Sequence, residues 1–516
     1  MSTANRVIKN TGFLYAKMGI TMFISLYTTR LILNSLGASD FGIFNIVGGA
    51  ISMLGFLNAA MASATQRFMS YSEGEGNKEK QKAIFNVSFI LHLIISIIVG
   101  LSLFIAGYFF FNGILNIPEN RILAAKVVYG SLIVSTIFTV MTVPYDAAMN
   151  AHENMKYYAV IGVFEALLKL AVAYACVYTT HDKLIIYGSL MACIPLITLT
   201  IMRIYCHKYY NECIIAPRLY WNKSIMKEMT LFASWNFMGA VSGIVSQYGL
   251  SIILNHFWGT ILNAAQGIAN QISGQLMTFS NTMLKALNPV IIKSKGSHND
   301  IMMIKASLLG CKYAYLMLIF FSIPFMLEAH FILKIWLKDI PEWAILFCQL
   351  QLLRSIMEQL TISIGSILSA QGQIKEISIY KSILGIQPVI LTAIFFYFKF
   401  PPYTMYIVWI LCGGVLGGLI SLYYSHQLCG LKYRDYINIV LYPCIIPTII
   451  IVLIGYLPQF IFTQSYLRLC ITITTTSICF VIINWKLLSS EEKKIITELT
   501  QKYTSKFLSY GNLRKN

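Results

Sequence analysis

Charged residues are scarce in this sequence, and acidic residues are the scarcest. Asp, Glu, Lys and Arg together make up 12% of the 516 residues, with 39 basic residues against 21 acidic ones. A soluble domain carries about 25% charged residues, so the composition excludes a chain built from ordinary water-soluble domains. The net charge of +18 is spread over short polar segments rather than gathered in one basic domain, which argues against nucleic-acid binding.

Motifs of catalysis and of metal or nucleotide binding are missing too. The eleven cysteines show no CxxC spacing, and the eight histidines are isolated from one another. The patterns GxxxxGK[ST], HExxH and GxSxG do not occur. We therefore expect no enzyme, no metal site, no cofactor and no ATP-driven step within this chain, while coupling to H⁺ or Na⁺ stays open.

Apolar stretches of about 20 residues dominate what remains. Hydrophobic residues make up 57% of the chain, and the mean hydropathy is +0.66. One helical crossing of a bilayer needs roughly 20 apolar residues. The sequence thus predicts an all-α polytopic membrane protein with about 14 transmembrane helices. The expected spans are residues 11–34, 41–65, 83–111, 123–150, 158–179, 184–205, 230–257, 261–287, 306–329, 343–369, 377–398, 405–425, 437–457 and 467–486.

Lys and Arg are distributed unequally between the two sets of loops. One set contains Lys78, Lys80 and Lys82 and is richer than the set that contains Arg121 and Lys183. Because cytoplasmic loops carry the excess of Lys and Arg, we expect both termini in the cytoplasm of a multi-pass protein of the cell inner (cytoplasmic) membrane. Residues 487–516 are predicted to form a cytoplasmic amphipathic tail on the anionic inner leaflet.

The chain contains an internal duplication. Residues 31–34 (LILN) recur as residues 252–255 (IILN), an offset of 221, and the hinge residues Asn77 and Asn299 lie 222 apart. This predicts two parallel six-helix lobes, an architecture in which transporter halves rock about a central cavity. The expected division is 1–205 for the N-terminal lobe, 206–229 for a cytoplasmic linker, 230–425 for the C-terminal lobe, 426–486 for two additional helices, and 487–516 for the tail.

The duplicated region opens with a recognisable motif. Residues 31–49 contain Leu36-Gly37 followed by Asp40-Phe41-Gly42, and Arg67 closes the second span. This pattern resembles Wzx-type polysaccharide and O-antigen repeat-unit flippases of the multidrug/oligosaccharidyl-lipid/polysaccharide exporter superfamily. The resemblance implies a MATE-like transporter of polysaccharide or lipopolysaccharide biosynthesis. Its substrate would be an undecaprenyl-pyrophosphate-linked oligosaccharide, flipped to the periplasmic leaflet by alternating access. A polysaccharide polymerase and a chain-length regulator are the candidate partners.

Ionisable side chains inside the spans are the candidate site residues, because each costs roughly 2.5 to 3.5 kcal/mol at the bilayer centre unless it faces a wet or paired interior. The basic ones match the need of a pyrophosphate for charge-assisted hydrogen bonds. The candidates for the substrate cavity are Lys17, Arg30, Lys169, Lys285, Arg354 and Lys381. The candidates for ion coupling are Asp146, Glu165 and Glu358.

Each candidate also has a structural alternative. Glu165 and Lys169, like Arg354 and Glu358, are four residues apart and can pair on one helix face. Lys285, Lys381 and Arg30 can extend toward the membrane surface, and Asp146 can be a loop-end carboxylate near Arg67 or Lys156.

Two other functions remain open. A cation-coupled multidrug exporter of the same superfamily would favour acidic cavity residues over the basic ones seen here. An integral-membrane polysaccharide polymerase would also be polytopic and basic. It would normally carry a large outer loop, and the longest outer hinge here is roughly residues 330–342.

Overall fold

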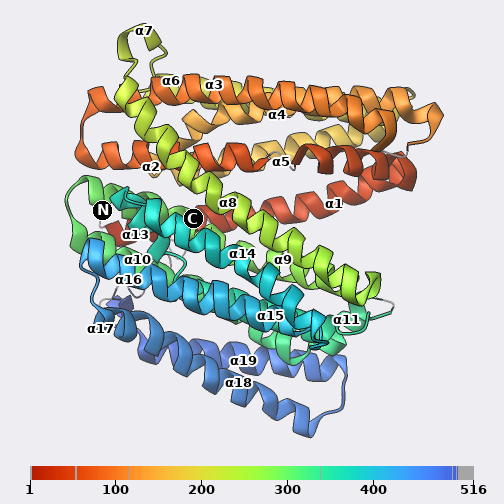
Figure 1. The fold of residues 1–516 in the computed structure, drawn as a ribbon, viewed down its shortest axis with the longest axis vertical. Helices are drawn as coiled ribbons and strands as arrows, with labels where there is room; N and C mark the ends of the chain where they lie inside the picture. Colours follow the sequence, from red (N-terminus) through yellow and green to blue (C-terminus); the bar gives the residue numbers. More distant parts are fainter. Residues whose placement is uncertain are drawn as a thin grey trace, which may run out of the picture.

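The computed structural model describes residues 3–52, 55–114, 117–337, 339–490, 492–494 and 497. Within these ranges the regular structure is entirely helical, without a strand. The long helices run side by side across the molecule (Figure 1). The predicted all-α polytopic fold is therefore confirmed. The expected tail, residues 487–516, lies mostly outside the described residues.

The helices are named in chain order. Their bounds are α1 Thr3–Ser52, α2 Gly55–Glu75, α3 Lys78–Phe109, α4 Ile122–Ala151, α5 Met155–Tyr178, α6 Lys183–Tyr209, α7 Pro217–Tyr220, α8 Lys223–Trp258, α9 Thr260–Gly296, α10 Asp300–Leu327, α11 Ala329–Trp336, α12 Ala344–Gln359, α13 Ile364–Gln371, α14 Lys375–Tyr397, α15 Thr404–Trp409, α16 Gly417–Cys429, α17 Tyr433–Tyr436, α18 Tyr442–Ile461 and α19 Tyr466–Leu487. Short π-helical segments, Ile410–Leu416 and Ile437–Leu441, join α15 to α16 and α17 to α18.

Ten helical segments within the described residues are long and apolar enough to cross a membrane. The other expected spans coincide with parts of α1, with α2, with α9 and with the pair α12 and α13. These helices carry more polar residues, as in the run Asn270-Gln271 of α9. A helix can remain polar inside a membrane only where the polar side faces protein or a water-filled space, and α2 and α9 face each other.

Asparagine side chains start corresponding helices in the two halves of the chain. Asn77 precedes α3 and accepts a hydrogen bond from the backbone N–H of Lys80. Asn299 precedes α10 and accepts the equivalent bond from Met302. Each side chain satisfies one of the backbone donors left free at a helix start. The sequence offset of 222 therefore corresponds to a repeated local structure.

Two glycines break the helices at corresponding positions. Gly37 interrupts α1 with φ of 77°, and Gly259 separates α8 from α9 with φ of 80°. Glycine adopts this left-handed region without steric cost, whereas other residues are strained there. The two positions are again 222 residues apart (259 minus 37), and each turns the chain between two long antiparallel helices.

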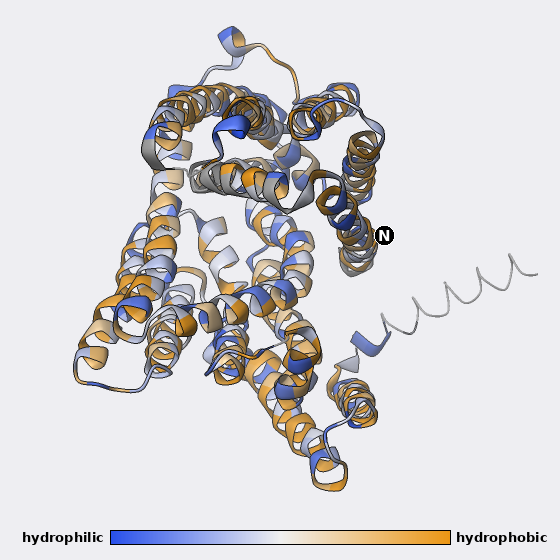
Figure 2. Cartoon of the chain, turned by 90° about the vertical axis from the view of Figure 1, so that its right-hand side faces the viewer, coloured by the Kyte–Doolittle hydropathy of each residue, from blue (hydrophilic) through white to orange (hydrophobic). Residues whose placement is uncertain are grey.

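The helices group by their order in the chain. In the first half, α1 packs on α5, and α4 packs on both α3 and α6. In the second half, α8 packs on α14, and α9 packs on α10 and α12. The pair α18 and α19 packs against α10 and lies at the far edge of the molecule (Figure 1). We call α1–α6 the first half and α8–α16 the second half. Figure 2, which looks along the helices, shows the two groups one above the other.

Large apolar side chains cover the outer surface. Along α3, Leu101, Phe104, Ile105 and Tyr108 lie on one side of the helix and are all exposed, Phe104 by 74%. A contiguous apolar surface of this kind would be unfavourable in water and is suited to the acyl chains of a bilayer. The structure thus supports a multi-pass membrane protein.

Candidate functional site at the interface between the halves

The two halves cross closely at two glycines. The end of α2 meets the end of α9 so tightly that a Cβ atom on Gly74 would lie 2.9 Å from the carbonyl carbon of Lys293 and closer still to its oxygen. A Cβ atom on Gly296 would lie 2.9 Å from the carbonyl carbon of Tyr71. The two glycines are 222 residues apart, as are Tyr71 and Lys293. The crossing is therefore a symmetric contact between duplicated positions, and it depends on the absence of both side chains.

Ion pairs join the halves at the same end. Lys293 Nζ of α9 lies 3.6 Å from Glu73 Oε1 and 3.8 Å from Glu153 Oε1. Arg6 Nε lies 2.7 Å from Glu153 Oε2. Burial raises the pKa of Glu153, and the charges of Arg6 and Lys293 oppose that rise. We call this end of the molecule, where Lys78, Lys80 and Lys82 also lie, the basic end.

Arg67 spans from α2 to the end of α13. Its Nε donates to the carbonyl oxygen of Ser369 at 2.8 Å, and its Nη2 donates to that of Ala370 at 3.2 Å. The guanidinium group also lies over the ring of Phe232, 5.1 Å from its centroid. The last carbonyl groups of a helix have no partner within the helix and carry partial negative charge. An arginine with several donors in one plane suits this position.

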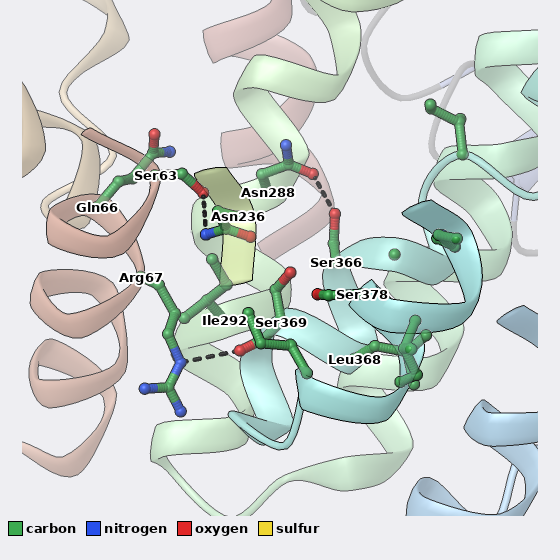
Figure 3. A pocket seen from close by; sticks show the side chains of 15 residues that line it. Ser63, Gln66, Arg67, Asn236, Asn288, Ile292, Ser366, Leu368, Ser369 and Ser378 are labelled. Carbon is green, nitrogen blue, oxygen red and sulfur yellow. Dashed lines mark hydrogen bonds between the residues drawn. The ribbon is translucent and has the colours of Figure 1, made fainter. Parts of the chain in front are cut away.

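A cavity of about 280 Å³ lies between α2 and the helices α8, α9, α13 and α14 (Figure 3). Within it, Asn236 donates to Ser63 at 3.4 Å, and Ser366 donates to Asn288 at 2.8 Å. The lining mixes neutral polar residues with aliphatic ones, and it has two basic groups and no carboxylate. Its residues are Ser63, Gln66, Arg67, Asn236, Asn288, Ile292, Ile362, Gly365, Ser366, Leu368, Ser369, Ile374, Ile377, Ser378 and Lys381.

Lys17 and Lys285 meet at one tyrosine. Lys285 of α9 donates a hydrogen bond to the Tyr158 hydroxyl of α5, and its Nζ lies 3.8 Å from the ring centroid. Lys17 of α1 places its Nζ 4.2 Å from the same centroid. Asp146 of α4 interacts electrostatically with both lysines. Its Oδ1 atom is buried and accepts no hydrogen bond from the residues that the structure describes. The cluster brings together three predicted site residues, Lys17 and Asp146 from the first half and Lys285 from the second, around Tyr158 of α5.

For Lys285 and Asp146, the structure does not support the structural alternatives considered from the sequence. Lys285 points to Tyr158 rather than toward the membrane surface. The charged neighbours of Asp146 are Lys285, Lys17 and Glu165, and not Arg67 or Lys156.

The other candidates lie apart from this cluster or are already paired. Lys169 Nζ lies 2.7 Å from Glu165 Oε1. Arg354 Nη2 lies 3.3 Å from Glu358 Oε2, and its guanidinium carbon lies 3.8 Å from the centroid of the Trp409 ring. These distances fit the alternative of structural pairing within one helix.

Two basic candidates have no such pairing. Arg30 is exposed and makes no hydrogen bond or ion pair with the described part of the chain, and it is not among the residues that line the cavity. Lys381 lines the cavity.

Asp40 of the quoted motif acts at the opposite end of the first half. Arg121, just before α4, lies 2.5 Å from Asp40 and 2.6 Å from Asp182, which starts α6. The hydrogen bonds from Arg121 hold the pKa of Asp182 below its ordinary value, against the effect of burial. The acidic position of the motif therefore has a structural role, since it ties the turn at Gly37 to two other helices.

Sequence reasoning missed several residues of the interface. Tyr158 carries no charge, and the polar cavity residues belong to types that occur throughout the chain. The crossing of Gly74 and Gly296 did leave a signal, because the two glycines share the offset of 222 that relates Asn77 to Asn299.

The fold defines a class of protein. The MatE family model matches residues 16–175. A crystal structure of MATE in complex with MaD3S has a TM-score of 0.71 at 14% identity, covering 82% of this chain and 96% of that chain. An outward-facing multidrug resistance MATE family transporter of the MOP superfamily gives a TM-score of 0.70 at 13% identity, with 82% and 95% covered. The chain therefore has the fold of MATE membrane transporters.

Two further proteins are similar to this chain, one in structure and one in sequence. A MOP superfamily transporter from Pyrococcus furiosus Vc1 has a TM-score of 0.68 at 15% identity, covering 82% of this chain and 95% of that chain. The reverse polarity of its binding pocket suggests a different function for that protein. The uncharacterized membrane protein EpsK of Bacillus subtilis (strain 168) is 23% identical over 123 residues, which are 24% of each chain. The chain thus matches about a quarter of the length of this curated relative.

Proposed function

We propose that the protein is a transporter of an undecaprenyl-pyrophosphate-linked oligosaccharide, an O-antigen or other surface polysaccharide repeat unit. It moves this lipid from the cytoplasmic to the periplasmic leaflet of the inner membrane. The observation that carries the proposal is the convergence of Lys17 and Lys285 on Tyr158, one lysine from each half.

The chemistry of this cluster suits a phosphate-bearing head group. Two ammonium groups and a phenol supply several hydrogen-bond donors, and phosphate oxygens accept strong charge-assisted hydrogen bonds from them. Asp146 is the carboxylate that interacts with both lysines, so one positive charge remains without a counter-charge. Inside a membrane an uncompensated charge is costly, and a bound anion removes that cost.

The contact of α2 with α9 at Gly74 and Gly296, which we call the closed crossing, supports transport by alternating access. By the distribution of Lys and Arg, the basic end faces the cytoplasm, so the contact of Gly74 with Gly296 closes the cytoplasmic side. When the halves rock apart at this end, α9 carries Lys285 away from Tyr158 and Asp146. The lysine is then free to receive an anion from the cytoplasmic leaflet. Asp146 is the coupling residue of this scheme, because Glu165 and Glu358 already have basic partners.

A multidrug exporter shares the same fold and is the second candidate. Such a transporter binds amphipathic cations and needs carboxylates to receive them. The described cavity has two basic groups in its lining and no carboxylate. This difference favours an anionic substrate.

The proposal is tested in proteoliposomes with a fluorescent lipid-pyrophosphate oligosaccharide. Lys17→Met and Lys285→Met each remove a charge-assisted hydrogen bond worth about 1.5–3 kcal/mol, so each is expected to lower the transport rate at least about tenfold. Lys223→Met is the matched control, because Lys223 is exposed at the start of α8 and its side chain makes no hydrogen bond or ion pair with the described part of the chain. Export of ethidium in place of the lipid would establish the multidrug alternative. Normal lipid transport by both lysine variants at equal protein level would overturn the proposal.

A further inference from the structure

We infer that the polar cavity beside α9 binds a sugar ring that bears a carboxylate, with Lys381 as its counter-ion. The inference rests on the proposed function and deepens it, because it assigns the class of sugar in the carried repeat unit. The cavity is separate from the cluster of Lys17, Lys285 and Tyr158, none of which lines it.

Lys381 is the basic group of the cavity that lacks a partner. It makes no ion pair or hydrogen bond with the residues that the structure describes, and no charged group among them acts on it. Arg67, the other cation of the lining, directs its Nε and Nη2 at the carbonyl groups of α13. The ammonium group of Lys381 is exposed in the cavity and is therefore available to pair with an anionic ligand. The site therefore favours an anion beside Lys381.

The neutral lining suits a carbohydrate. Sugar hydroxyl groups both donate and accept hydrogen bonds, and a carboxamide side chain also offers both kinds of group. Asn236 uses its amide nitrogen toward Ser63, and Asn288 uses its amide oxygen toward Ser366, as Figure 3 shows. The two asparagines face the cavity from α8 and α9 and so present opposite hydrogen-bonding groups to a ligand.

Helix α9 contributes residues both to the cavity and to the cluster of Lys17, Lys285 and Tyr158. Lys285, Asn288 and Ile292 are spaced three and four residues apart and therefore share one side of the helix. A pyrophosphate held by Lys285 would place the first sugars about one helical turn away, beside Asn288. Asn288 precedes Gly296 by eight residues, about 12 Å along a helix. The bound sugar would therefore lie on the inner side of the closed crossing.

The experiment compares two lipid-pyrophosphate probes that differ in one group, a glucosyl and a glucuronyl derivative of the same short polyprenol. Binding to the full-length protein in detergent is measured by thermophoresis. The native protein is expected to bind the glucuronyl probe about tenfold more tightly, as one charge-assisted hydrogen bond implies. Lys381→Met should abolish that preference without weakening the glucosyl probe, and Lys381→Arg should retain it. Asn288→Ala should weaken both probes.

The outcomes separate this inference from the proposed function. Equal affinity of the native protein for the two probes would overturn the sugar assignment and leave the transporter proposal standing. Failure of both probes to bind would instead count against the proposed function. A third probe, the polyprenyl pyrophosphate without sugar, tests the remaining alternative. If Lys381→Met weakens this probe as much as the glucuronyl one, the ammonium group serves the phosphate and the inference is wrong.

Discussion

The crossing of α2 and α9 makes a sharp prediction, because a single methyl group should prevent it. Gly74→Ala adds a Cβ atom 2.9 Å from the carbonyl carbon of Lys293 and 3.0 Å from the Cα atom of Gly296. Carbon atoms in contact are about 3.5–4.0 Å apart. The two helices must therefore separate by at least roughly 1 Å at this point, because the carbonyl oxygen of Lys293 is closer than either carbon atom. Since the neighbouring atoms belong to the backbone, no side chain can rotate to make room.

The expected energy follows from the cost of overpacking. Inserting a methyl group into a closely packed contact costs about 1–3 kcal/mol, and only the closed state makes this contact. The ratio of closed to open molecules should fall by roughly 5- to 150-fold. Gly296→Ala should act in the same way, because the duplicated position meets Tyr71 at the same distance. The double variant should destabilise the closed state by less than the sum of the two single substitutions, because either methyl group alone already separates the helices.

Hydrogen–deuterium exchange of the full-length protein, together with transport in proteoliposomes, measures the effect. Residues 71–76 and 293–298 should exchange faster in both variants, and transport should slow. The matched control is Gly19→Ala, because a Cβ atom there meets nothing within 4 Å. Alanine gains about 1 kcal/mol over glycine in a helix, so the control also shows the effect of that gain alone. Unchanged exchange and transport in Gly74→Ala would refute the closed crossing as a required state.

The remaining predictions concern two ion pairs that hold parts of the fold. Arg121→Gln should lower stability by roughly 1 kcal/mol at pH 7. Arg121 lowers the pKa of Asp182 in the folded protein. The ion pair therefore contributes to folding stability at pH values above about 4, the pKa of Asp in the unfolded chain, and this contribution is lost as the pH falls below that value. The native protein and the variant should thus melt at similar temperatures in strong acid, and a gap that persists there would contradict the assignment. Lys312 Nζ lies 2.8 Å from Glu492 and is buried, so Glu492→Gln should destabilise the protein by about 3–5 kcal/mol, while Lys312→Met with Glu492→Leu should restore most of the loss. Thermal unfolding in detergent measures this cycle, and equal stability of all its members would rule out a structural role for the pair.

The sequence predicted the fold correctly because the bilayer imposes a simple length rule. Each expected span coincides with one helix or with consecutive helices. This includes α9, which is not among the ten segments that are apolar enough by themselves to cross a membrane. The asparagine pair revealed the duplication because a helix start has a local chemical signature, which Asn77 and Asn299 both carry.

The sequence pointed to some residues of the candidate site and not to others. The scarcity of charge inside the spans drew attention to Lys17, Lys285 and Asp146, which the structure brings together, and to Lys381, which lines the cavity. The same argument also selected Arg30, which lies elsewhere. A charged residue within a span indicates that its side chain needs a polar environment. The sequence does not indicate which helix provides that environment.

What the sequence determined by itself was therefore the all-α membrane fold, the spans and the offset of about 222 residues between repeated features. These follow from local properties, namely the length of apolar runs and the residues that start and break helices. Only the tertiary structure decided that Tyr158 joins Lys17 to Lys285, that Arg67 meets the end of α13, and that Gly74 meets Gly296. Such contacts join residues that are often more than 100 positions apart. They depend on how whole helices pack, which no local pattern specifies.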